Sequence, residues 1–344
     1  MTFYNLKTIY QNCSDKFRFV CFNTDRLNAD RLGALLLMLL LSTPNISKSN
    51  QPATILESHL SKRIHQPTIT AIYKDHNQFI WIGTQQGLYR YDGANLVEFN
   101  SSPNATNSIP VSDIRGIFED SDNNLHIATF GKGLLKWNDS NYQFEEVNIK
   151  TLSDAKFLTL AFHSKTGHII LGSKDNLISF YDKKETSQDQ NSLIELEQQT
   201  GRPYDITESI SGDILVASEK GLFRLSIDRR EIQKVFPNDL RELDDFGIVT
   251  SVELGPKGAV FIGTSKGYVL LWDLKESKSL SRILLGKRST ESVTQLLRSK
   301  DSLWIGSNNG LYISDLSLSS ITKFNQENSG LSSNHVTTLL SDNH

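Results

Sequence analysis

Cysteine is nearly absent from this 344-residue sequence, which contains two, Cys13 and Cys21. Both lie before residue 50, and the rest of the chain has none. A disulfide framework and a cysteine-based zinc site are therefore excluded for most of the chain. An exported domain that folds without disulfides fits this composition, and so does a cytosolic protein.

An excess of charge of either sign is also missing. The 36 Lys and Arg residues against 39 Asp and Glu residues give a net charge of −3, and no polybasic run occurs. Nucleic acids and anionic membranes select basic surfaces, so neither is an expected partner. The near neutrality leaves the charge of a small ligand open.

Long apolar runs are absent except near the N-terminus, where residues 32–41 read LGALLLMLLL. As a helix this run would be roughly 15 Å long, about half of a bilayer. Arg26 and Arg31 precede the run and a polar stretch follows it, which is the order of a secretory signal. We therefore assign residues 1–50 to a region with a signal peptide or signal anchor, and we predict a periplasmic location. A buried helix is the alternative.

The segment before this run is long for a signal, with 31 residues that include Asp15, Asp25 and Asp30. A start codon placed too far upstream would explain this length. No A-x-A cleavage site follows the run, so the segment is either cleaved at another site or retained as an anchor.

A short apolar run that ends in a small residue occurs six times after residue 50. The intervals between the small residues are 45, 44, 45, 46 and 43 residues. Such regular spacing is typical of a repeat architecture. The small residues are Gly83, Ala128, Gly172, Ala217, Gly263 and Gly306.

A residue that tolerates positive φ follows each small residue after four or five positions and marks a tight hairpin turn. One strand-like run precedes each apolar run and two follow it, as with residues 68–73, 80–84, 88–91 and 96–99. Each unit is therefore predicted to hold four antiparallel strands. The turn residues are Gly87, Gly133, Asn176, Gly221, Gly267 and Gly310.

Units of this length and strand count favour an all-β fold, a β-propeller of four-stranded blades. We predict six complete blades and the start of a seventh. The small residue of each unit is expected where neighbouring blades crowd together. Trp81 and Trp304, two positions earlier, are expected to pack between blades rather than to bind a ligand.

The sequences Ile80-Trp81-Ile82-Gly83-Thr84 and Gly87-Leu88-Tyr89-Arg90-Tyr91 resemble the two-component regulator propeller repeat. The run that contains Trp304 matches it nearly as well. This repeat forms the periplasmic sensor half of many bacterial hybrid sensor kinases and some diguanylate cyclases. The resemblance covers about residues 55 to 344, so residues 51–344 are assigned to one propeller domain.

Residues 329–344 resemble the beginning of another repeat. Residues 336–340 are expected to form the inner strand of a seventh blade and residues 55–60 its outer strand, with its two middle strands missing. The propeller is therefore predicted to close incompletely. We expect the chain to be a fragment of a longer sensor, without the transmembrane and output domains of its relatives.

Catalytic and metal-binding patterns were not found, and no cofactor is expected. None of the eight histidines has HExxH or HxH spacing, and neither a GxSxG nor a Walker motif occurs. His163 and His168 are assigned to different strands or to their connecting turn. Asp120-Ser121-Asp122 fits a turn better than a calcium loop, because the rest of the calcium pattern is missing.

The resemblance implies an exported ligand-sensing domain that is not itself an enzyme. Its ligand would be a small molecule or an oligosaccharide, and full-length relatives would be dimeric. Membrane contact is expected only through the N-terminal segment or a missing C-terminal helix. A periplasmic propeller enzyme of the lyase or quinoprotein type and an interaction scaffold stay open as alternatives.

The ligand-binding residues are not identified by the sequence. Arg90, Tyr91 and Arg224 are candidates by residue type. They occupy repeated strand positions, so packing and surface roles are the expected assignment, whereas ligand contacts are expected in loops that differ between repeats.

Overall fold

The structure is a computed structural model. It describes the backbone of residues 4–10, 18–23, 54–57, 60, 63–64, 68–102, 107–147, 156–173, 178–182, 200–226, 231–237, 244–286 and 290–341. Side chains are described for the same residues except 4–10, 18–23, 54–57 and 178–182.

Six sheets follow the order of the repeats, and the strands within each are antiparallel neighbours. The first to third sheets contain β4 (Ile69–Lys74), β5 (Ile80–Thr84), β6 (Gly87–Tyr91) and β7 (Leu96–Phe99); β8 (Ile114–Glu119), β9 (Leu125–Thr129), β10 (Gly133–Asn138) and β11 (Gln143–Glu146); and β12 (Leu158–His163), β13 (His168–Ser173) and β14 (Ile178–Asp182). The fourth to sixth contain β15 (Pro203–Glu208), β16 (Ile214–Ser218), β17 (Gly221–Ser226) and β18 (Glu231–Phe236); β19 (Val249–Leu254), β20 (Val260–Thr264), β21 (Tyr268–Asp273) and β22 (Lys278–Leu284); and β23 (Val293–Ser299), β24 (Ser302–Ser307), β25 (Gly310–Asp315) and β26 (Ile321–Phe324).

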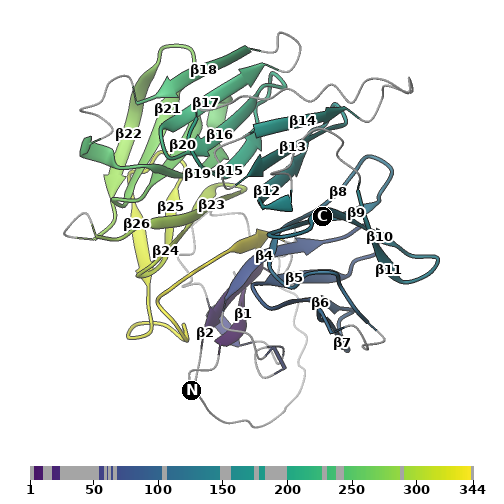
Figure 1. The fold of residues 1–344 in the computed structure, drawn as a ribbon. Coiled ribbons are helices and arrows are strands. Elements are labelled where there is room, and N and C mark those ends of the chain that lie inside the picture. Colours follow the sequence, from purple (N-terminus) through teal and green to yellow (C-terminus); the bar gives the residue numbers. More distant parts are fainter. Residues whose placement is uncertain are drawn as a thin grey trace, which may run out of the picture.

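The predicted β-propeller arrangement is confirmed, with five four-stranded sheets and one sheet of three strands among the described residues. In Figure 1 the sheets follow one another around a common centre. The first strand of each sheet, here called the inner strand, contacts the inner strand of the next sheet. The expected strand boundaries agree to within one or two residues, as for β4 and β6.

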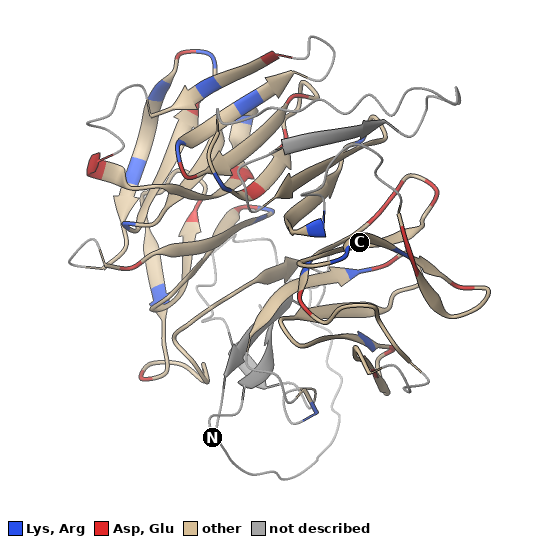
Figure 2. Cartoon of the chain, viewed as in Figure 1, with Lys and Arg blue, Asp and Glu red and all other residues tan. Residues whose placement is uncertain are grey.

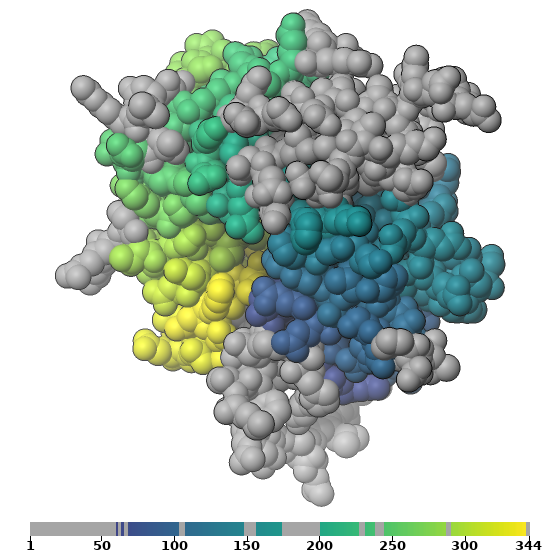
Figure 3. Space-filling model, viewed as in Figure 1, coloured from purple at the N-terminus to yellow at the C-terminus, as the bar shows by residue number. Residues whose placement is uncertain are grey.

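A further sheet joins the two ends of the chain. We call it the mixed sheet because it combines N-terminal and C-terminal strands, and all its strand pairs are antiparallel. It has the order β27-β2-β1-β3, with β27 (Leu339–Ser341), β2 (Arg18–Asn23), β1 (Tyr4–Tyr10) and β3 (Thr54–Glu57). β27 contacts β23 on one side and β4 on the other. Figure 3 shows the C-terminal segment side by side with the first sheet.

The expectation that this last sheet lacks its middle strands is therefore wrong. β2 pairs with β27 through Arg18–Ser341, Phe19–Leu340 and Val20–Leu339, and β1 links β2 to β3. Pairing gives the backbone groups at the edge of β27 the partners that an open edge would lack. Sequence reasoning missed β1 and β2 because neither resembles the repeat.

The expected export segment is described only in part. β1 and β2 lie within residues 1–50, whereas the leucine-rich run at 32–41 lies outside the described residues. No helix in the part of the chain that the structure describes is long and apolar enough to cross a membrane.

The small residues of the repeat lie where one sheet meets the next inner strand. An ideal Cβ on Gly83 would be 2.6 Å from Ile114 Cγ2, and one on Gly263 would be 2.5 Å from Val293 Cγ1. An ideal Cβ on Gly172 would be 2.6 Å from Pro203 Cγ. Side chains at these positions would push adjacent sheets apart.

The hairpin between the second and third strands is fixed by a hydroxyl in several repeats. The side chains of Thr84, Thr129, Ser218 and Ser307 donate to the carbonyl oxygen of the turn glycine at 2.9, 2.7, 2.8 and 2.8 Å. Gly133 and Gly267 have φ of 70° and 80°, which favours glycine. Asn176 lies outside the described residues.

The core lies between adjacent sheets. Trp81, which is 1% exposed, packs on Phe99 of its own sheet and on Trp137 of the second, with ring centroids 5.7 Å away in both cases. Trp304 packs with Leu331 and Val336 next to the mixed sheet. Both tryptophans are thus packing residues, as predicted.

Three side chains at one repeat position link successive inner strands. Asp205 Oδ2 accepts the Val252 N–H at 3.0 Å, and Ser251 Oγ accepts the Leu296 N–H at 2.9 Å. Gln295 Oε1 accepts the Leu339 N–H at 2.5 Å. Each acceptor serves the inner strand of the next sheet, from the fourth sheet to β27. The first three sheets have Ala71, Gly116 and Leu160 at this position.

Candidate functional site

Every inner strand of the six repeat sheets carries a register shift near its start. The shift lies between Ile69 and Ala71 in β4 and between Pro203 and Asp205 in β15, and the other four strands have it at the same repeat position. The extra residue of a β-bulge is left unpaired in the ladder between the two strands. We call the side of the ring where the inner strands begin the bulge face.

Four of the six bulged residues are threonines, namely Thr70, Thr159, Thr250 and Thr294. Thr70 Oγ1 donates to Ile114 O at 2.6 Å, and Thr294 Oγ1 donates to Val336 O at 2.6 Å. Ile114 belongs to the inner strand of the next sheet and Val336 lies three residues before β27, so these bulged residues lie along the inner edge of the ring. The second and fourth sheets differ, because their bulged residues are Arg115 and Tyr204.

Arg115 is held in a cluster on the bulge face. Its guanidinium makes two contacts of 2.8 Å with Asp113, one from Nε to Oδ1 and one from Nη2 to Oδ2. It also lies 5.4 Å from the centre of the Phe130 ring, and that ring is 5.2 Å from the Phe157 ring of the third sheet. The two-point ion pair fixes the guanidinium in one orientation.

Tyr204 is more exposed than is usual for an aromatic residue in a strand, at 39%. The guanidinium of the exposed Arg202 lies 5.9 Å from the centre of its ring. The Arg202 carbonyl accepts the Glu219 N–H at 2.9 Å, which ties this strand entrance to the hairpin between β16 and β17. The second to fourth sheets therefore gather aromatic rings and guanidinium groups on one face.

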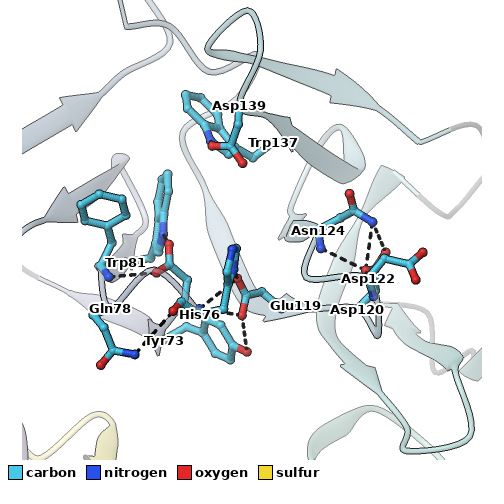
Figure 4. Close-up of polar contacts among 12 residues, drawn as sticks. Tyr73, His76, Gln78, Trp81, Glu119, Asp120, Asp122, Asn124, Trp137 and Asp139 are labelled. Carbon is cyan, nitrogen blue, oxygen red and sulfur yellow. Dashed lines mark hydrogen bonds and ion pairs between the residues drawn. The ribbon is translucent and has the colours of Figure 1, made fainter.

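The opposite face contains the hairpins between the first and second strands, shown for the first two sheets in Figure 4. The buried Asp75 accepts the Phe79 N–H at 2.8 Å and the Trp81 Nε1–H at 2.7 Å. In the second sheet the buried Asp120 contacts His126 Nε2 at 3.0 Å and accepts the Asn124 N–H at 3.0 Å. Both aspartates order their own hairpin, as predicted for the turn at 120–122.

A histidine–carboxylate contact joins these two hairpins (Figure 4). His76 Nδ1 lies 2.6 Å from Glu119 Oε1, and the His76 N–H donates to Glu119 Oε2 at 3.0 Å. The Glu119 hydrogen bond raises the pKa of His76. Tyr73 OH is 3.4 Å from Glu119 Oε2, and burial, followed by the Glu119 charge, raises the pKa of Tyr73 to about 12.

On this face, residues at the ends of three inner strands contact the hairpin of the preceding sheet. Glu119 of the second sheet accepts from His76 of the first, and Glu208 of the fourth accepts the Lys165 N–H of the third at 2.8 Å. In the sixth sheet Arg298 donates to Gly255 O of the fifth at 3.1 Å. These contacts fix one hairpin against the next and explain the charged residues here without a ligand.

The candidates chosen by residue type have local partners. The Arg90 guanidinium lies 4.8 Å from the ring centre of Phe79 and 5.6 Å from that of Trp81, and Tyr91 OH donates to Gly93 O. Arg224 Nε is 3.1 Å from Asp213 Oδ2. These positions fit the packing and surface roles expected for them.

The arrangement of the polar side chains that the structure describes bears on metal binding. Among the side chains that the structure describes, no group of three His, Cys, Asp or Glu residues could hold a metal ion. His163 ends β12 and His168 begins β13, so the two lie on either side of a turn. Lys, Arg, Asp and Glu are interspersed over the sheets seen in Figure 2.

The fold and the repeat chemistry define a β-propeller built from repeated sheets. A family model described as two component regulator propeller matches residues 64–86, which include β4 and β5. The match confirms the resemblance drawn from the motif around Trp81. A search of curated proteins found no match to the chain.

Several solved structures share the fold. Two are extracellular domains from B. thetaiotaomicron assigned to hybrid two component systems, BT4673 (TM-score 0.63, 20% identity) and BT3049 (TM-score 0.61, 20% identity). They cover 76% and 78% of this chain, whereas this chain spans 37% and 36% of theirs. A catalytically inactive virginiamycin B lyase from Staphylococcus aureus, solved with quinupristin, is similar at TM-score 0.58 and 11% identity, with 89% of this chain and 92% of that chain covered.

Sequence reasoning missed the bulge face as a candidate site. The signal was present, since aligning the repeats on their small residues places Arg115 and Tyr204 where Thr70, Thr159 and Thr250 recur, with Thr294 one position away. Nothing in the one-dimensional pattern shows that the residue belongs to a bulge rather than to a sheet face.

Proposed function

We propose that this chain is the ligand-sensing propeller of a bacterial signal-transduction receptor, of the hybrid histidine kinase or diguanylate cyclase type. The supporting observation is the regulator propeller motif in β4 and β5, on a fold shared with extracellular domains assigned to two component systems. The bulge face supports a binding role, because its aromatic and guanidinium groups break an otherwise repeated scaffold.

We further propose a propeller of seven blades, six of them within residues 51–344 and the seventh formed by the mixed sheet, whose β1 and β2 come from residues 1–50. We also propose a periplasmic location. Residues 1–50 would direct export through the apolar run at 32–41. Cleavage after this run would remove β1 and β2 from the mixed sheet. The intact mass of the exported chain tests this point, since a retained N-terminus would identify an anchor rather than a cleaved signal.

In such a receptor the ligand acts on an attached domain across the membrane. A ligand can shift that domain only by binding one arrangement of the receptor more tightly than another. The propeller alone is therefore not expected to signal. We expect the complete receptor to be a dimer, with a small molecule or an oligosaccharide as its ligand and no cofactor in the propeller.

The decisive experiment is to sequence the gene beyond codon 344. A following apolar segment of about 20 residues and a kinase or cyclase domain are expected. A stop codon there would contradict the receptor assignment. A fusion of residues 1–60 to a reporter that is active only in the periplasm tests export separately, and an inactive reporter would contradict the location.

A propeller lyase is the second candidate. It is favoured by the similarity to virginiamycin B lyase, which extends over 92% of that chain. The test is incubation of the purified chain with quinupristin, followed by chromatography and tandem mass spectrometry, because elimination within a ring leaves the mass unchanged and only the fragment pattern shows it. Ring opening of quinupristin would favour this candidate, and unchanged quinupristin would favour the sensor.

A further inference from the structure

We propose that the junction of the inner strands β15, β19 and β23 is a proton-controlled link in the ring. In this proposal the three strands stay together while Glu253 is protonated, and they loosen at this junction once Glu253 ionises. The inference goes beyond the proposed sensor function, because it concerns how the ring itself responds to pH, and it does not depend on that function.

Glu253 is an exception in the repeat. It occupies the inner-strand position that pairs with the residue two places before the small residue, and it is the only carboxylic acid at this position. The other five sheets have an aromatic, aliphatic or hydroxyl side chain there, so closure of the ring does not itself require a carboxyl group. The equivalent residues are Tyr73, Phe118, Phe162, Thr207 and Leu297.

Glu253 lies next to the residue that joins three sheets. It is two residues after Ser251 in β19, and alternate residues of a strand point to the same face. Ser251 donates to Asp205 of β15 and accepts the Leu296 N–H of β23. The backbone N–H of Arg298, also in β23, donates to Glu253. The carboxyl group therefore lies at the contact between the fifth and sixth sheets, beside the links from the fourth.

Few charged groups face Glu253 from the elements packed against β19, which are β15, β16, β20 and β23. β16 and β20 contain no Asp, Glu, His, Lys or Arg residue. β15 contributes Asp205, whose negative charge opposes ionisation of Glu253, and β23 contributes Arg298, whose positive charge favours it. The other titratable residues of β15 are directed elsewhere, because Tyr204 is exposed and Glu208 accepts a backbone N–H of the third sheet.

Ionisation of Glu253 therefore places a second carboxylate charge beside Asp205 with one guanidinium nearby. Burial is the largest cause that raises the pKa of Glu253, to about 7, and the Asp205 charge adds to it. A charge that is desolvated without full pairing is relieved when water reaches it. Opening of the junction admits this water, and it also exposes the Leu296 and Arg298 amides, which bond to Ser251 and Glu253.

The experiment is native-state hydrogen exchange of the whole chain, read by mass spectrometry, at pH 6 and pH 8 and at several urea concentrations below the unfolding transition. Protection is calculated relative to the intrinsic exchange rate at each pH. Glu253→Gln removes the titration, and Glu253→Leu introduces the residue type that the sixth sheet has at this position. Glu276→Gln, in the exposed hairpin between β21 and β22, is the control.

At pH 8 the amides of β19 and β23 should exchange through an opening that depends little on urea, because a local opening exposes little surface. Their protection should be about tenfold lower at pH 8 than at pH 6, since each pH unit above the pKa of the closed state favours the ionised, open state about tenfold. The amides of β5 and β9 should exchange only through urea-dependent global unfolding. Both Glu253 variants should give β19 and β23 that same behaviour, whereas Glu276→Gln behaves like the parent chain.

Three results would overturn the proposal. The first is equal protection of β19 and β23 at the two pH values. The second is a urea dependence in β19 and β23 as steep as in β5 and β9, which would show that these strands open only when the whole chain unfolds. The third is a local, pH-dependent opening that persists in Glu253→Gln or Glu253→Leu. The first two results come from the parent chain alone, so they hold whether or not the variants fold, which circular dichroism checks.

Discussion

Asp205 and Ser251 form a hydrogen-bonded pair between the inner strands of the fourth and fifth sheets. The Ser251 hydroxyl donates to Asp205 Oδ2 at 2.6 Å and accepts the Leu296 N–H of the sixth sheet at 2.9 Å. Burial raises the pKa of Asp205, and the hydrogen bonds from Ser251, Val252 and Ile206 oppose this shift. Two side chains thus connect three sheets in a region closed to water.

Ser251→Ala should destabilise the protein by about 1–3 kcal/mol, because it leaves the buried Leu296 N–H without its acceptor and removes one of the three donors to Asp205. The free energy of unfolding in urea measures this. Ser279→Ala, on the exposed edge strand β22, is the matched control and should change stability by less than about 0.5 kcal/mol. Equal effects of the two substitutions would show that the link between sheets contributes nothing.

Glu253 makes the stability of the folded protein depend on pH. Burial raises its pKa to about 7, and the nearby Asp205 adds to the shift. The folded protein therefore holds this proton more tightly than the unfolded chain, so stability falls as pH rises from about 4.5 through about 7. Glu253→Gln should remove this fall.

The variant should be more stable than the parent at pH 8 by about 1–3 kcal/mol and should show no gain at pH 4. Urea unfolding at the two pH values measures the difference. Glu276→Gln, in the exposed hairpin between β21 and β22, is the control. A gain of the same size at both pH values would mean that Glu253 does not titrate in this range.

The repeat itself could be predicted from the sequence because its causes are local and periodic. Small residues such as Gly83 and Gly263 meet the next inner strand in the same way, and turn glycines such as Gly267 have positive φ. The packing of Trp81 and Trp304 was predictable for the same reason, because both belong to the repeated apolar run. These features recur every 43 to 46 residues.

The links between sheets could not be predicted, because they use different chemistry at equivalent positions. Asp205, Ser251 and Gln295 share a function but no residue type. Near the end of the inner strand, the sixth sheet contacts its neighbour through the Arg298 guanidinium, whereas the second and fourth sheets use the carboxylates of Glu119 and Glu208. The pairing of β2 with β27 joins the two ends of the chain, which no repeat pattern encodes.

His76 and Glu119 form a pair whose titration can be measured directly. Because the Glu119 hydrogen bond is the largest cause of the raised pKa of His76, Glu119→Gln should lower this pKa toward 6.5. The NMR titration of the His76 ring protons measures it. Glu276→Gln again serves as the control and should leave the titration unchanged. An unchanged pKa in Glu119→Gln would contradict the contact at 2.6 Å.

The fifth and sixth sheets approach each other closely at Gly263. A Cβ there would lie 2.5 Å from Val293 Cγ1 and 3.1 Å from Val293 Cβ, so Gly263→Ala should destabilise by about 1–3 kcal/mol through overpacking. Val293→Ala should also destabilise, because it removes buried methyl groups. In the double variant the new methyl group enters the space that those methyl groups leave. The loss in urea unfolding should therefore be smaller than the sum of the two single losses by at least about 0.5 kcal/mol. Additive losses would mean that the glycine is required for its backbone rather than for the spacing of the two sheets.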